Sequence, residues 1–176
     1  MSQVANEIAS AERPDIEKKE IEEINCLFVP LSASALLVPM SAVAEVIQTT
    51  DVSVEENAPV WFSGWLEWRQ KRVPLISFEA LGNETHQDFS RNTSALIMNT
   101  LSPEKGLSYY AIQAQDFSHL IRIAEDDPLN QVEGQGDVPH VLMQVELDEQ
   151  IMQIPDLESL ESYLVSSLQG YVRGAK

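Results

Sequence analysis

The most informative stretch of this chain reads Gly64-Trp-Leu-Glu-Trp-Arg-Gln-Lys-Arg-Val-Pro74-Leu-Ile-Ser-Phe78. Residues 64–68 and 72–78 are largely apolar and flank the polar segment 69–71, a pattern that predicts a β-hairpin. Trp65 and Trp68 fall on opposite faces of the first strand, because successive side chains of a strand alternate. One tryptophan is therefore expected in the core. The other, for which we take Trp65, is either an exposed anchor for a partner or is also covered by neighbouring strands.

Short strand-like segments recur on both sides of this hairpin. They are rich in Val, Ile, Tyr or Phe and are bounded by turn-forming residues, as is typical of short strands. The predicted strands lie at 24–30, 35–39, 45–48, 94–99, 108–115, 118–124, 140–147 and 150–154, and a single turn is expected at 41–43. Many short strands at regular spacing predict an all-β fold of barrels or a sandwich rather than an α/β fold.

One helix is predicted, at residues 156–169. Asp156 follows a proline and can cap the first turn, and Gly170 is expected to end the helix. Leucines recur at helical spacing on one face, at Leu157, Leu160, Leu164 and Leu168. This leucine stripe is expected to pack on the sheets, and a helix that binds a partner is the alternative.

The chain is strongly acidic. Its 176 residues include 28 Asp and Glu against 11 Lys and Arg, which gives a formal net charge of −17. Nucleic acids and anionic lipids require a basic face, so neither is expected as a partner, and a protein with basic patches fits better. No apolar run approaches the length that spans a bilayer, so no membrane insertion is expected. The N-terminus lacks the pattern of a signal peptide, so we expect a cytoplasmic protein with a flexible acidic tail at residues 1–22.

No constellation of catalytic residues is recognisable. His86, His119 and His140 lack the spacing of metal ligands, and no glycine-rich loop precedes a helix to hold a phosphate. Cys26 is the single cysteine, and its apolar neighbours predict a buried side chain rather than a nucleophile. We therefore predict no catalytic site, no metal and no cofactor. The alternatives are a small β-barrel enzyme or ligand- or metal-binding domain that uses the carboxylates near Glu125, and an acidic regulator that mimics nucleic acid.

A basic cluster in the predicted hairpin turn stands out against this acidic background. It consists of Arg69, Lys71 and Arg72. Such a cluster can pair with carboxylates within the fold or with carboxylates of a partner. The hairpin is therefore the place where a specific contact is expected.

An ordered series of motifs surrounds the hairpin. An apolar strand leads into Val43-Ala-Glu45-Val-Ile47, and Pro59, Gly64–Gln70, Val73-Pro74 and Ala80-Leu-Gly82 follow in order. This order resembles the CheW-like family of chemotaxis coupling proteins, whose members show Val-x-Glu-Val-Ile and then Gly, apolar residues, Arg-Gly, a hydrophobic residue and Pro. Weaker agreement continues through the later strands and the closing helix.

The chain departs from the family pattern at two places in the hairpin. Gln70 stands where the family has glycine, and the Trp-Leu-Glu-Trp run at 65–68 stands where it has Val-Ile-Asn-Leu. These departures suggest an accessory member, similar to coupling proteins of type IV pilus (twitching) chemosensory systems such as ChpC. Because glycine permits a positive φ, glutamine at position 70 predicts a different hairpin turn.

The resemblance implies two intertwined five-stranded barrels of the Src-homology-3 type within residues 23–176. The first barrel would consist mainly of residues 23–82 and the second mainly of residues 94–154, with a linker loop at 83–93. The implied function is that of a non-catalytic adaptor. It would couple methyl-accepting chemoreceptors to a CheA-type histidine kinase.

The resemblance also implies a partner-binding site. By position match, Glu45 and Arg69 lie near the family's receptor-binding region. Their opposite charges can pair and hold two elements in register, and the alternative is a surface charge pair of little energetic value. A groove between the barrels would bind a receptor helix through apolar side chains, for which Val43, Val46 and Val73 are the candidates.

Overall fold

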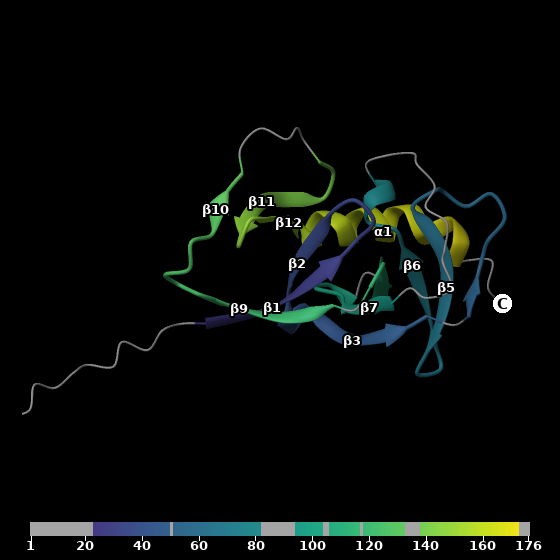
Figure 1. The fold of residues 1–176 in the computed structure, drawn as a ribbon. Coiled ribbons are helices and arrows are strands. Elements are labelled where there is room, and N and C mark those ends of the chain that lie inside the picture. The colour runs from purple at the N-terminus through teal and green to yellow at the C-terminus, as the bar shows by residue number, and fades with distance from the viewer. Residues whose placement is uncertain are drawn as a thin grey trace, which may run out of the picture.

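The computed structural model describes residues 23–49, 51–81, 94–103, 106–116, 118–132 and 138–172, which form two β-sheets and one α-helix (Figure 1). The sheet that we call the terminal sheet joins strands from both ends of the chain. In spatial order it contains β10 (Asn130–Gln131), β11 (Val141–Leu147), β12 (Gln150–Pro155), β2 (Ala35–Pro39), β1 (Glu23–Pro30) and β9 (His119–Ala124). β2 pairs with β12 in parallel, and the other neighbours are antiparallel.

The second sheet, which we call the central sheet, uses strands from the middle of the chain. In spatial order it contains β3 (Val43–Gln48), β7 (Ser94–Asn99), β8 (Tyr109–Ala114), β6 (Lys71–Ile76), β5 (Phe62–Trp68) and β4 (Val52–Ser53). β6 and β8 are the parallel pair of this sheet. The 3₁₀ turn η1 (Met40–Ala42) leads from the terminal sheet into the central sheet, and η2 (Glu79–Leu81) follows β6.

The predicted all-β fold class of two intertwined barrels is confirmed, and each of the two sheets takes strands from both halves of the chain. β1 and β2 belong to the sheet of β9–β12, and β7 and β8 belong to the sheet of β3–β6. Sequence patterns mark strands but not their partners, and the two parallel pairs join strands that are distant in the chain. The two-residue strands β4 and β10 lie outside the predicted strands and bring each sheet to six strands rather than five.

Two predicted segments, the tail at 1–22 and the linker at 83–93, lie outside the described residues. The strands before and after the second of these, β6 and β7, belong to the same sheet.

Three apolar clusters fill the fold. One lies inside the central sheet and is formed by Leu66, Trp68, Val73, Leu75, Ala95, Ile97 and Ala111. Another lies inside the terminal sheet and contains Cys26, Ala35, Leu37, Val145 and Met152. Cys26 is buried, as predicted, and burial raises the pKa of its thiol. The largest cluster joins residues of both sheets to the helix.

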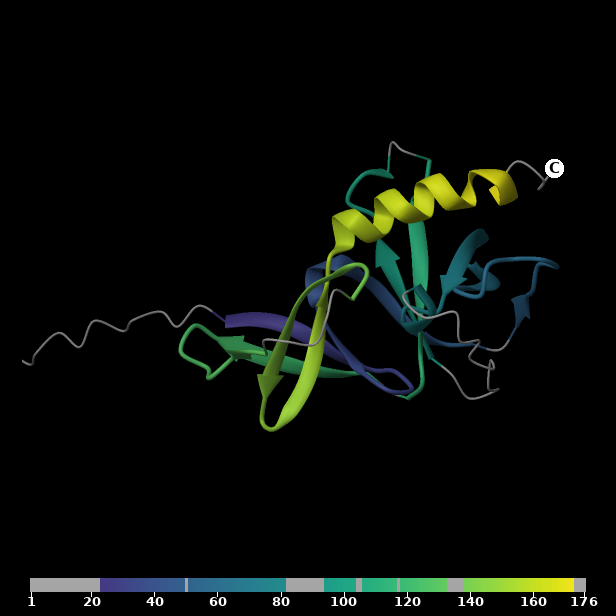
Figure 2. The same ribbon diagram turned by 90° about the horizontal axis from the view of Figure 1, so that it is seen from above.

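Helix α1 (Leu157–Val172) covers this largest cluster. Figure 2 shows it running from the end of β12 across to the central sheet. Its leucine stripe packs inward as predicted, with Leu160, Leu164 and Leu168 no more than 2% exposed. Asp156 caps the helix, because its carboxylate accepts a hydrogen bond from the Ser159 amide at 3.0 Å. The helix continues past Gly170, so the predicted end is wrong; a single glycine weakens a helix by about 1 kcal/mol without removing a hydrogen bond.

The turn of the β5–β6 hairpin is unusual in its residues, because neither of its two central residues is glycine. Trp68 pairs with Lys71, and the two residues between them, Arg69 and Gln70, have φ angles of 47° and 62°. Positive φ at both central residues defines a type I′ turn, the geometry that matches the twist of a hairpin. The prediction that glutamine requires a different turn is therefore wrong, because the backbone of Gln70 adopts the left-handed conformation.

Gly64 fixes how β4 lies against β5. It sits at a bulge in β5 with a φ of 134°, and an added Cβ would lie 2.5 Å from the Ser53 carbonyl oxygen. Only glycine tolerates both the angle and the close approach. The bulge therefore lets β4 lie against the strand that carries both hairpin tryptophans.

Candidate functional site

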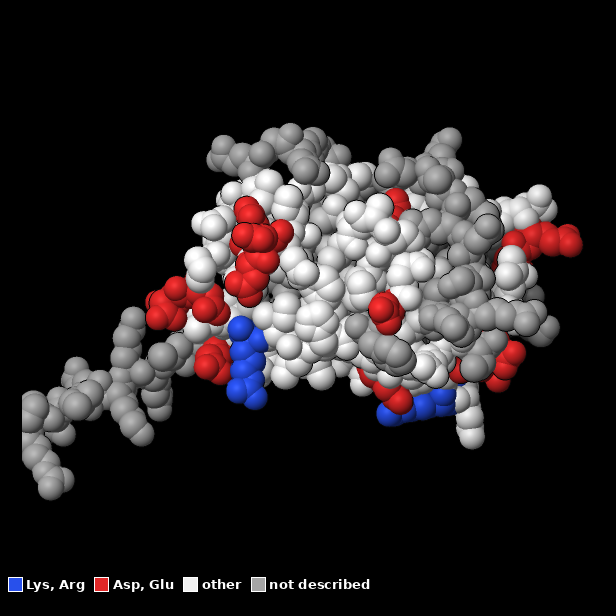
Figure 3. Space-filling model, in the orientation of Figure 1, with Lys and Arg blue, Asp and Glu red and all other residues white. Residues whose placement is uncertain are grey.

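The tip of the β5–β6 hairpin concentrates positive charge. It carries Arg69, Lys71 and Arg72, and the described part of the chain contains one further Lys or Arg, Arg122 on β9. Figure 3 shows the basic patch of the tip at the lower right, with carboxylates directly against it. Arg69 and Arg72 are each paired with a glutamate, at 2.8 and 2.9 Å, so the tip combines both signs of charge. A negatively charged group of a partner is attracted mainly to the cation that has no carboxylate among the described residues.

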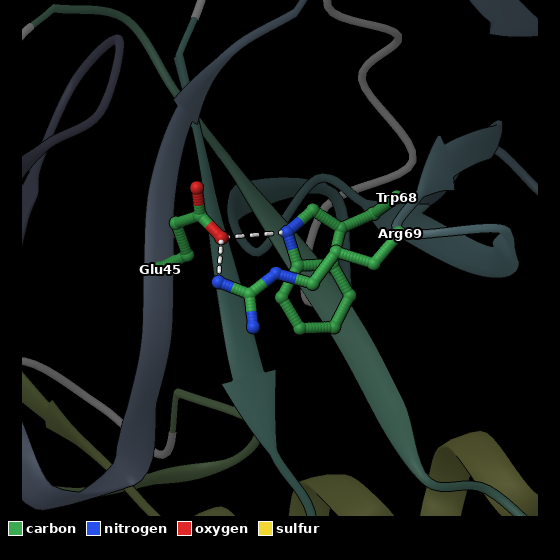
Figure 4. Close-up of polar contacts among 3 residues, drawn as sticks. All are labelled: Glu45, Trp68 and Arg69. Carbon is green, nitrogen blue, oxygen red and sulfur yellow. Dashed lines mark hydrogen bonds and ion pairs between the residues drawn. The ribbon is translucent and has the colours of Figure 1, made fainter.

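Glu45, Trp68 and Arg69 form the first of two similar clusters, which we call the Glu45 cluster (Figure 4). Glu45 Oε2 accepts hydrogen bonds from Trp68 Nε1 at 2.9 Å and from Arg69 Nη2 at 2.8 Å. The Arg69 guanidinium also lies over the Trp68 ring, 4.7 Å from its centroid. Glu45 belongs to β3, which is not a neighbour of β5 in the order of the sheet. The contact therefore exists because the central sheet curls until these strands approach each other.

The energy of the Glu45 cluster lies mainly in its hydrogen bond to the indole. The side chains of Arg69 and Glu45 are 68% and 39% exposed, and an ion pair this exposed contributes about 0–1 kcal/mol. Trp68, in contrast, is only 7% exposed. Without Glu45 its N–H would lose its acceptor, which costs about 1–3 kcal/mol when the donor is buried. Glu45 therefore joins β3 to the hairpin mainly through Trp68, and the exposed guanidinium remains accessible.

Glu55, Trp65 and Arg72 repeat this arrangement, and we call them the Glu55 cluster. Glu55 Oε1 accepts hydrogen bonds from Trp65 Nε1 at 3.0 Å and from Arg72 Nη2 at 2.9 Å. The Arg72 guanidinium lies 4.6 Å from the centroid of the Trp65 ring. Sequence reasoning missed Glu55, because it lies in an irregular segment after β4 with no periodic pattern. The hairpin is thus held by a carboxylate on each of its faces.

Two of the predicted partner-binding residues are core residues. Trp65 is 6% exposed, so it is not an exposed anchor, and the alternative that both tryptophans are covered is correct. Val73 is 1% exposed inside the central sheet, so it cannot contact a receptor helix. β6 lies between β5 and β8, and Val73 points to the inner face of the curled sheet. Val46 is 38% exposed on β3, and Val43 is half-buried against the largest cluster, so these two stay candidates.

A pocket of about 430 Å³ opens beside the hairpin tip. Its walls include Trp65, Lys71, Arg72, Pro74, Leu107 and Tyr109. The β7–β8 connection supplies one of these walls. This connection is tied to helix α1, because the buried Glu161 carboxylate accepts hydrogen bonds from the amides of Leu101 at 2.5 Å and Ser102 at 3.3 Å. Burial, assisted by the charge of Glu161, raises the pKa of the Tyr110 hydroxyl on the adjoining strand.

Within the described ranges, no three His, Cys, Asp or Glu side chains are grouped so that they could hold a metal ion. His119 packs against the Phe28 ring, whereas His140 Nδ1 lies 2.9 Å from Ser159 Oγ; His86 lies outside the described residues. No helix in the described part of the chain has both the length and the apolar character that crossing a membrane requires.

Comparisons with known proteins agree with this architecture. The family model described as "CheW-like domain" matches residues 25–163. A crystal structure of the scaffolding protein TtCheW from Thermoanaerobacter tengcongensis is similar, with a TM-score of 0.61 and 16% sequence identity over 76% of this chain and 89% of that chain. No curated protein matches the sequence. The family match covers most of the chain, including both sheets and the start of the helix, and the chain therefore belongs to the CheW-like family.

Proposed function

We propose that this chain is a non-catalytic cytoplasmic adaptor that couples methyl-accepting chemoreceptors to a CheA-type histidine kinase. Membership of the CheW-like family supports a coupling role, and the similar TtCheW structure is described as that of a scaffolding protein. The observation that carries the proposal is the hairpin tip. There, the family's glutamate and arginine positions, Glu45 and Arg69, meet in an exposed ion pair.

The geometry of Arg69 suits recognition of a partner. One nitrogen of its guanidinium donates to Glu45, and one face of the guanidinium plane packs on the Trp68 ring. The side chain is still 68% exposed. A guanidinium carries five N–H donors, so several stay available for a carboxylate or a carbonyl of a receptor or kinase. Val46 is also exposed on β3, but it follows Glu45 directly and therefore points to the opposite face of the strand. Arg69 is thus a prepositioned binding group next to Glu45, which is what a scaffold requires.

A narrower proposal is an accessory role in a type IV pilus (twitching) chemosensory system, of the ChpC kind. It rests on the departures of this hairpin from the usual family pattern. Gln70 replaces the turn glycine, and Trp65 and Trp68 provide the indole donors of the two clusters. Both clusters make the hairpin more rigid than apolar side chains alone would. We infer that such a hairpin selects a different receptor or kinase from those bound by family members with the usual hairpin.

Co-purification from an extract of the source cells tests the adaptor role. Wild-type protein is expected to retain a CheA-type kinase and a chemoreceptor. Arg69→Glu and Glu45→Gln are the informative variants. The first reverses the exposed charge, whereas the second removes the charge of Glu45 but keeps an oxygen that accepts from Trp68. Arg69→Glu should reduce capture at least tenfold, because it replaces an attraction with a repulsion.

Arg122→Glu is the matched control, because it makes the same reversal at an exposed arginine on the far sheet. It should leave capture unchanged. If wild-type protein retains neither a kinase nor a receptor, the adaptor proposal is wrong. If both partners are retained equally by Arg69→Glu and Arg122→Glu, the adaptor role stands, but the hairpin is not its binding surface.

A further inference from the structure

The pocket beside the hairpin tip is separate from the Glu45 cluster. β6 and β8 pair only at Leu75 with Ala111 and at Ile76 with Ile112. The first half of β6 and residues 106–109 therefore face each other without pairing, and the pocket of about 430 Å³ lies between them. None of the three residues of the Glu45 cluster lines it. Its volume is within the range of sites that bind small ligands or a few residues of a peptide.

Lys71 is the cation of this pocket whose charge is not matched within the described chain. Arg69 and Arg72 each pair with a glutamate, at 2.8 and 2.9 Å. No carboxylate of the described residues pairs with Lys71. Its ammonium lies 4.6 Å from the centroid of the Tyr109 ring, and this cation–π contact holds the group at the pocket. The ammonium has three N–H donors, so those directed away from the ring are available to an acceptor.

The other walls of the pocket are apolar or aromatic. Trp65, Pro74, Leu107 and Tyr109 line it together with the two cations Lys71 and Arg72. Such walls favour a ligand that joins a negative charge to an apolar group. Although the whole chain has a net charge of −17, the Lys71 ammonium has no carboxylate partner among the described residues, so it attracts an acidic side chain locally.

We propose that this pocket binds an acidic segment of a partner protein, with a carboxylate of that segment on Lys71 and an adjoining apolar side chain against Leu107 and Tyr109. The identity of that partner as a receptor or kinase rests on the proposed function. Binding of an acidic peptide does not, since it requires neither protein. The Glu55 cluster prepares the site, because it holds Arg72 and the Trp65 ring in fixed positions at its edge.

Titration of the purified full-length protein with a blocked synthetic peptide, acetyl-Glu-Leu-Glu-Glu-Leu-Glu-amide, tests this proposal. Nitrogen–proton NMR spectra report the site through the Trp65 indole and the amides of residues 106–109. We expect those signals to shift, and we expect the dissociation constant to rise about fivefold in Lys71→Gln, the loss for one partly exposed charge pair of about 1 kcal/mol. Arg122→Gln, the matched control, should bind as the wild type does.

Two further ligands test whether binding depends on the charge of the peptide and on its length. The neutral peptide, with Gln in place of each Glu, should bind at least tenfold more weakly, and free glutarate should produce no comparable shifts. The proposal is overturned if the acidic peptide gives no shifts at these signals, if Lys71→Gln binds it equally well, or if glutarate alone binds as tightly. In the last case the pocket is a site for small anions. If the peptide binds but cell extracts yield neither kinase nor receptor, the pocket proposal stands and the adaptor proposal fails.

Discussion

Replacement of Gln70 by glycine should stabilise the protein. Gln70 has a φ of 62°, and the left-handed conformation costs a residue with a Cβ about 1–2 kcal/mol. Glycine adopts that conformation freely but loses about 0.5–1 kcal/mol more backbone entropy on folding. Gln70 is exposed, so the substitution removes no buried side chain. The net gain is therefore about 0–1.5 kcal/mol, with a central value of about 0.75 kcal/mol, which corresponds to a rise in Tm of about 2–3 °C for a chain of this length.

Urea unfolding followed by circular dichroism measures this gain. The matched control is Gln48→Gly, the same substitution at the exposed last residue of strand β3. It should destabilise by about 0.5–1 kcal/mol, because an ordinary strand position gives glycine only the entropy cost. The second two-residue turn, between β11 and β12, has φ angles of 50° at Asp148 and 64° at Glu149, so Glu149→Gly should reproduce the gain. If Gln70→Gly destabilises the protein as much as Gln48→Gly does, the strain argument is refuted.

Two other perturbations follow from single observations. Gly64→Ala should cost at least about 2 kcal/mol in urea unfolding, because the new Cβ would lie 2.5 Å from the Ser53 carbonyl at a φ that only glycine favours; an unchanged midpoint would show that β4 shifts freely. Burial lowers the pKa of His140, against an opposing effect of Asp156. The fold therefore favours the neutral ring, and His140 should lower stability progressively as the pH falls below about 6.5, where the unfolded chain takes up the proton first. Urea unfolding at about pH 7.5 and at about pH 5 measures this effect. The free energy of unfolding should fall more between these two pH values for wild type than for His140→Gln, and equal falls would contradict this reasoning.

Local patterns were sufficient to place most of the longer strands and the helix, but not the two-residue strands β4 and β10. The predicted strands at 35–39 and 94–99 coincide with β2 and β7, because each is a short apolar run between turn-forming residues. The leucine stripe of the helix also follows from spacing alone, since residues three and four apart share a face of a helix. The turn at Arg69 and Gln70 did not follow, because the tertiary contacts of Arg69 with Glu45 and Trp68 support a conformation that neither residue prefers.

By itself, the sequence determined the all-β class, the hairpin, the capped helix and the basic cluster at the hairpin tip, because each depends on residues close together in the chain. The tertiary structure alone decided which strands are neighbours, since the parallel pairs β2–β12 and β6–β8 join distant segments. The tertiary structure also decided which charged residues of the hairpin are paired with a carboxylate. The curl of the central sheet brings Glu45 to Arg69, the bulge at Gly64 lets β4 lie against β5, and Glu55 pairs with Arg72. The Lys71 ammonium lies over the Tyr109 ring and has no carboxylate partner among the described residues. No pattern in the sequence distinguishes Lys71 from Arg69 and Arg72 in this respect.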